Sequence, residues 1–205
     1  MIDLIVSVAD SYQENLMDGL LPRIPRSATT RNFSYKIVQN IGHDSGSYND
    51  SHELLRPSIN KYRYALVVFD FEGTGIEQSM TPEQAESNVE RLLDRNGWPG
   101  RNSVIIVNPE IENWLWQDNP NIQRAIGWTH TLSLYTWARQ NGKIRPNQVK
   151  PFRPKETFEE ALRICRTSKS SSIYKKIASS VSYKGCTDPS FIKLIQQLST
   201  WFPII

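Results

Sequence analysis

Several features that quickly assign a protein to a class are scarce in this chain of 205 residues. It has only two cysteines, Cys165 and Cys186, and they are not spaced as a Cys-x-x-Cys pair. This excludes a disulfide framework and gives no support to a zinc site. So few cysteines are typical of the reducing cytoplasm, where we expect the protein to be found.

Long hydrophobic runs are also missing. No stretch approaches the ~20 apolar residues of a membrane-spanning helix, and the first residues carry Asp3 and no basic region, which argues against a secretory signal. Gly73 and Gly75 fit neither the dinucleotide-binding nor the Walker spacing, and no Gly-x-Ser-x-Gly elbow is present. With 39% hydrophobic and 22% charged residues, the composition predicts a soluble folded protein without a membrane partner.

The net charge of +3 hides an uneven distribution along the chain. Residues 119–205 hold 14 of the 24 Lys and Arg residues and 4 of the 21 Asp and Glu residues, a balance of +10. Residues 1–118 are therefore at −7. A basic second half favours binding of a polyanion such as DNA or RNA. The alternative is that the two halves pack against each other through complementary charges.

The segment Tyr64–Gly73 organises the rest of the chain. Five apolar residues, from Ala65 to Phe69, run into Asp70 and Glu72, and a glycine follows. This pattern predicts a strand that is buried on both faces and ends in two carboxylates. In an open parallel sheet, ligands bind at the carboxyl ends of the strands, so we expect a functional site here.

The first 118 residues alternate between strand and helix patterns. Apolar or alternating runs predict strands at residues 2–8, 33–38, 65–69 and 103–107, with helices between them. This order predicts an α/β fold with a mostly parallel four-stranded sheet and helices on both faces. Residues 119–205 show helical patterns only, so we expect an α/β domain at 1–118 and a basic helical extension at 119–205 packed on it.

Local signals place the connections between these elements. Thr81-Pro-Glu-Gln has the pattern of a capping box that starts a helix running to about Arg95. Pro22 and Pro25 predict the end of the first helix. Residues 40–50 are rich in Gly, Ser, Asn and Asp, which predicts a long loop holding His43 and Asp44, followed by a helix over residues 51–62.

Carboxylates follow three of the predicted strands: Asp10 the first, Asp70 and Glu72 the third, and Glu110 and Glu112 the fourth. The carboxyl ends of parallel strands share one edge, so these side chains can converge. Hard oxygen ligands suit Mg²⁺ or Mn²⁺, and the chemistry that fits is metal-assisted phosphoryl transfer. His43, in a loop at the same edge, is a candidate general base, although such a histidine is more often simply solvated.

These residues resemble the Toprim fold of primases, topoisomerases and OLD-type nucleases, over residues 1–118. The resemblance is carried by the acidic end of the first strand and by the Asp-x-Glu after the third. Asn108-Pro-Glu-Ile-Glu-Asn-Trp114 is similar to a Pro-Glu-x-Glu-x-Trp element of small bacterial Toprim-related proteins, some of them associated with defence. It implies Mg²⁺-dependent nucleic-acid chemistry in anti-phage defence or DNA processing, with Asp70 and Glu72 as metal ligands and Glu112 as an acidic partner.

One departure from this pattern leaves two functions open. The Toprim pattern has Glu-Gly at the end of the first strand, where this chain has Ala9 and Asp10. If Asp10 replaces that glutamate as a third metal ligand, the protein is a nuclease or phosphodiesterase whose catalytic residues are Asp10, Asp70, Glu72, Glu112 and His43. If it does not, the protein is a degenerate subunit that binds a partner protein or nucleic acid in a defence complex.

Overall fold

The computed structural model describes residues 1–27 and 30–204. Its centre is a four-stranded sheet with the order β2-β1-β3-β4 and all neighbours parallel. The strands are β1 (Ile2–Val8), β2 (Tyr35–Gln39), β3 (Tyr62–Asp70) and β4 (Asn102–Val107). The predicted α/β fold class is therefore confirmed, and the segment that organises the sequence is a central strand.

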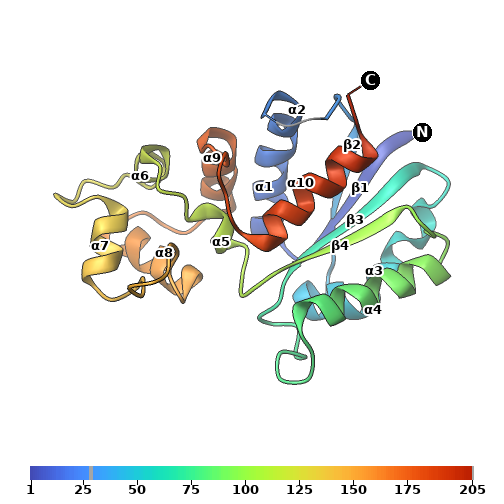
Figure 1. The fold of residues 1–205 in the computed structure, drawn as a ribbon, viewed down its shortest axis with the longest axis horizontal. Coiled ribbons are helices and arrows are strands. Elements are labelled where there is room, and N and C mark those ends of the chain that lie inside the picture. Colours follow the sequence, from blue (N-terminus) through green and yellow to red (C-terminus); the bar gives the residue numbers. More distant parts are fainter. Residues whose placement is uncertain (28–29, 205) are drawn as a thin grey trace.

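Helices cover both faces of the sheet, because alternate residues of each strand point to opposite sides. On β1, Leu4 and Val6 belong to one hydrophobic cluster and Ile5 to the other. The first cluster includes residues of α1 (Ser11–Leu20), α9 (Ser171–Ser180) and α10 (Pro189–Trp201), and the second includes residues of α3 (His43–Leu55) and α4 (Pro82–Arg95). Figure 1 shows these two layers of helices on either side of the strands.

The front half supplies the helices between the strands. They are α1 (Ser11–Leu20), the short η1 (Leu21–Arg23) and α2 (Ile24–Ser27), then α3 (His43–Leu55), η2 (Arg56–Ser58) and α4 (Pro82–Arg95). The capping box is confirmed: Thr81 Oγ1 accepts from the Gln84 amide, and Gln84 Oε1 accepts from the Thr81 amide.

One local prediction was wrong. Residues 43–50 are not a loop but the first turns of α3, which ends at Leu55, whereas a helix was expected over residues 51–62. This segment is so polar that apolar periodicity does not reveal it. The first helix, α1, does end at Leu20, just before Pro22, as predicted. Pro22 and Pro25 then lie in the first turns of two separate short helices, where proline is tolerated.

The back half is helical in the described residues, as expected. It contains α6 (Pro120–Ile126), α7 (Leu134–Gln140), α8 (Pro154–Ile164), α9 (Ser171–Ser180) and α10 (Pro189–Trp201), preceded by the single turn α5 (Glu112–Leu115). Helix α9 packs along α1, with the carbonyl of Lys175 against Gly19, and α10 packs on β4. The last helices therefore complete one face of the sheet. No helix in the described ranges is long and apolar enough to cross a membrane.

Candidate functional site

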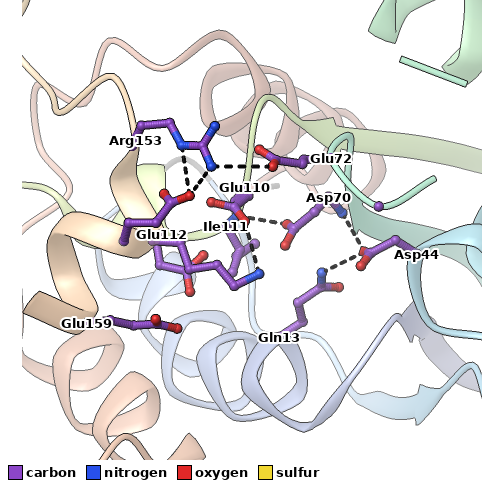
Figure 2. Close-up of polar contacts among 12 residues, drawn as sticks. Gln13, Asp44, Asp70, Glu72, Glu110, Ile111, Glu112, Arg153 and Glu159 are labelled. Carbon is purple, nitrogen blue, oxygen red and sulfur yellow. Dashed lines mark hydrogen bonds and ion pairs between the residues drawn. The ribbon is translucent and has the colours of Figure 1, made fainter. Parts of the chain in front are cut away.

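Asp70 lies at the centre of a group of buried acidic side chains at the carboxyl edge of the sheet. It is the last residue of β3 and is 8% exposed. Its Oδ1 accepts a hydrogen bond from the Ile111 amide at 2.7 Å, and its own amide donates to Asp44 Oδ1 at 2.9 Å. Figure 2 shows Asp70 between Asp44 on one side and the loop after β4 on the other.

Asp44 is a member of this group that the sequence interpretation did not select. It lies in the first turn of α3, and besides the Asp70 amide it accepts from Gln13 Nε2 at 3.2 Å. Gly73 passes close by: a Cβ at that position would lie 3.4 Å from Asp44 Oδ2. Asp44 could be identified only after residues 43–50 were placed in a helix that starts at the sheet edge.

Glu110 and Glu112 approach Asp70 from the segment after β4, which begins with the cis peptide Asn108–Pro109. Both glutamates are buried. Glu110 is paired with Lys155 of α8 at 3.0 Å. Glu112 accepts a 2.5 Å hydrogen bond from the Tyr174 hydroxyl of α9, and Lys169 Nζ lies 3.8 Å from it. The basic half of the chain therefore provides the partners of both side chains.

The environment raises the pKa of all four carboxyl groups. Burial raises the pKa of Asp70 well above its usual range, and the charges of Asp44, Glu112 and Glu110 add to this effect. Burial is also the largest cause for the other three. The effect of burial is opposed at Asp44 by hydrogen bonds from the Asp70 amide and Gln13. It is opposed at Glu110 by Lys155, and at Glu112 mainly by the hydrogen bond from Tyr174.

Lys155 is the cation closest to this group. Burial alone lowers its pKa, but the hydrogen bond to Glu110 and the charges of Glu110, Glu112 and Asp70 raise it overall. Lys155 is therefore held in its charged form. With the side chain 43% exposed, it also faces the solvent in front of the carboxylates.

The other predicted site residues lie at the margin of this group. Asp10 is the N-cap of α1, where its Oδ1 accepts from the amides of Tyr12 and Gln13. Glu72 is 48% exposed, and Arg153 lies 3.9 Å from it (Figure 2). His43 is exposed at the first position of α3, with a φ of 55°.

The structure brings Asp70, Glu110 and Glu112 together, as expected for the ends of neighbouring parallel strands, and adds Asp44 to them. It does not place Asp10, Asp70 and Glu72 as a compact set. Within residues 1–27 and 30–204, no three His, Cys, Asp or Glu side chains are arranged closely enough to hold a metal ion by themselves. Asp10 and Glu72 act on the group only at a distance, through their charges on Asp44 and Glu110.

The uneven charge distribution corresponds to contacts between the two halves. In the described part of the chain, five cationic side chains of residues 119–205 pair with carboxylates of residues 1–118. They are Arg153 with Glu72, Lys155 with Glu110, Lys169 with Glu112, Lys175 with Asp18, and Lys193 with Glu86 and Glu90. Part of the basic excess therefore serves intramolecular complementarity, the alternative that the sequence left open.

No protein-family model, curated protein or solved structure matches this chain. The geometry of the acidic edge is therefore the basis for any functional assignment.

Proposed function

We propose that the acidic edge binds a divalent cation and hydrolyses phosphodiester bonds of nucleic acid, with Asp70 and Asp44 as the metal-binding residues. The supporting observation is the charge balance of the site. The carboxyl groups of Asp44, Glu110 and Glu112 surround that of Asp70, while two lysines, Lys155 and Lys169, lie within 4 Å of this group in the described structure. This excess of negative charge is relieved either by protonation of a carboxyl group or by binding of a cation.

The available ligands fit Mg²⁺ or Mn²⁺ only as a partial set. Both ions prefer oxygen donors, and Mg²⁺ keeps several waters and commonly uses one or two protein carboxylates together with substrate phosphates. Asp44 and Asp70 can supply such a pair, which agrees with the lack of a three-residue cluster in the described ranges. When bound, the ion would activate a water and stabilise the leaving oxygen.

The neighbouring side chains then have defined tasks. Gln13 and the Asp70 amide fix the orientation of the Asp44 carboxylate, and the Ile111 amide fixes that of Asp70. Lys155 and Arg153, both partly exposed beside the acidic edge, are placed to contact a substrate phosphate. Tyr174 holds Glu112 through its hydroxyl.

A second function is favoured by the position of Asp10. Its carboxylate caps α1, so it is already committed to backbone amides and does not replace the glutamate of the Toprim pattern. The two lysines neutralise Glu110 and Glu112 without any metal. A protein with these features could retain the fold as a non-catalytic subunit that binds a partner in a defence complex.

Two measurements on the purified protein distinguish these functions. The first is calorimetric titration with Mn²⁺ or Mg²⁺ in the absence of nucleic acid, and the second is cleavage of end-labelled DNA and RNA with either ion. The proposal predicts that Asp44→Asn and Asp70→Asn lose metal binding and cleavage. Asp50→Asn, a change at an exposed position of the same helix α3 as Asp44, should keep both. Wild-type protein that neither binds the metal nor cleaves would favour the non-catalytic subunit.

A further inference from the structure

Four exposed cations of the back half are not used in the contacts between the halves. Arg124, Arg163, Arg166 and Lys176 form no ion pair with an acidic side chain in the described part of the chain. They differ in this from Lys155, Lys169 and Lys175, which come from the same or neighbouring segments. Their charges therefore remain available to a partner.

These cations belong to helices that meet at one place. Lys176 of α9 donates to the carbonyl of Ala125, next to Arg124, at 3.3 Å. The Thr167 hydroxyl, next to Arg166, donates to the carbonyl of Ile126 at 2.9 Å. The C-terminal ends of α6 and α8 and the middle of α9 thus lie side by side, and we name this region the α6–α8–α9 basic surface.

The acidic residues closest to this surface along α8 have cationic partners outside it. Glu159 is paired with Lys169 at 2.9 Å, and Glu160 with Lys143 at 2.5 Å. None of the four cations of the surface is therefore paired with these glutamates. An exposed cluster of Arg and Lys without acidic partners matches the phosphate backbone of nucleic acid, which binds by releasing counterions.

Lys169 connects the basic surface to the acidic edge. It follows Arg166 by three residues, and its ammonium group contacts both Glu159 of α8 and Glu112 of the acidic edge. Figure 1 shows α6, α8 and α9 on the same side of the sheet as α5, which follows the carboxyl end of β4. A nucleic-acid strand held on this surface would thus pass next to Lys169, which contacts the acidic edge.

We infer that Arg124, Arg163, Arg166 and Lys176 are the nucleic-acid-binding residues of this protein and guide the bound nucleic-acid strand to the acidic edge. The inference rests on the proposed function for the kind of polymer bound. It assigns the binding to the α6–α8–α9 basic surface and not to the basic half as a whole.

The test measures binding of a fluorescent DNA or RNA oligonucleotide by anisotropy, at several salt concentrations and with EDTA present. Binding is thereby separated from metal-dependent cleavage. The fourfold variant Arg124→Gln, Arg163→Gln, Arg166→Gln and Lys176→Gln should bind at least about tenfold more weakly at low salt. The slope of log affinity against log salt concentration should be smaller in magnitude by about 3, because each lost phosphate contact contributes ~0.7–0.9 to it.

A matched control removes the same amount of charge elsewhere. It carries glutamine at four exposed positions of the front half, Lys36, Lys61, Arg63 and Arg91. This control should keep a nearly wild-type slope. Equal losses in both variants, a wild-type slope in the first, or no binding by the wild type even at low salt would each overturn the inference. Circular dichroism confirms that both variants are folded, and binding that survives without cleavage would refute only the proposed function.

Discussion

The backbone amide of Asp70 donates a hydrogen bond to the carboxylate of Asp44, 26 residues earlier in the chain, at 2.9 Å. This contact joins the end of β3 to the start of α3. It therefore places a buried and a half-buried acidic side chain next to each other, although each has a raised pKa. The arrangement costs stability in the metal-free protein, and this cost can be measured.

Asp70→Asn should stabilise the metal-free protein at pH 7. The folded-state pKa of Asp70 lies well above that of an aspartate in the unfolded chain. The carboxyl group of Asp70 therefore makes the folded state less stable as the pH rises above about 4. An asparagine still accepts from the Ile111 amide but carries no charge. We expect the free energy of unfolding in urea, with EDTA present, to rise by about 1 kcal/mol or more, the equivalent of one pKa unit.

This gain should disappear near pH 4, where the wild-type carboxyl group is also protonated. Asp50→Asn serves as the control, since Asp50 is exposed on α3 and its replacement should leave the unfolding energy unchanged. A less stable Asp70→Asn variant at pH 7 would show that the ionised carboxylate is favoured where it lies.

Asp44→Ala should be destabilising, in contrast to the change at Asp70. Asp44 accepts from both the Asp70 amide and Gln13 Nε2, and alanine leaves these donors without an acceptor. An unsatisfied buried donor costs about 1–3 kcal/mol. Chemical denaturation should show a loss of this size, whereas Asp44→Asn, which keeps one acceptor oxygen, should lose clearly less. Equal losses in the two variants would contradict the role given to these hydrogen bonds.

Asp3 predicts an acid-sensitive contribution to stability at the opposite edge of the sheet. Its contact with Arg31 at 2.8 Å lowers the pKa of Asp3 to about 2. A folded-state pKa below the unfolded value means that the stabilisation is complete above about pH 4 and is lost as the pH falls toward 2. Asp3→Asn should therefore reduce the unfolding energy at pH 7 but not at pH 2. Parallel stability curves for the two proteins would be evidence against this ion pair.

The sheet could be predicted from the sequence because its signals are local. The strands are apolar runs of the expected length, and the Thr81 capping box marks the start of α4 in four residues. The acidic positions after β3 and β4 could also be found, since the ends of parallel strands share one edge. The side chains of Asp70, Glu110 and Glu112 therefore lie at one edge of the sheet, as expected.

What the sequence did not reveal depends on tertiary contacts. Helix α3 has almost no apolar stripe, so Asp44 seemed to lie in a loop. Asp10 caps α1, a role that the sequence did not separate from metal binding because a capping aspartate and a metal-binding aspartate look the same at the end of a strand. The pairing of Glu110 with Lys155 joins residues 45 positions apart, and no local pattern reports such a contact.

The last prediction concerns the outer edge of the sheet at β4, which side chains of α4 and α10 cover. Glu86 accepts from the Ile106 amide and Glu90 from the Val104 amide, while Lys193 donates to the Val104 carbonyl and to both glutamates. Such coverage blocks the backbone groups of an edge strand, which otherwise recruit other chains.

The double variant Glu86→Ala, Glu90→Ala should therefore aggregate on mild heating, as followed by light scattering. Glu53→Ala combined with Glu83→Ala, at two exposed glutamates, gives the same change in charge and should not aggregate under these conditions. Equal aggregation of the two variants would assign the effect to net charge and not to the exposed edge.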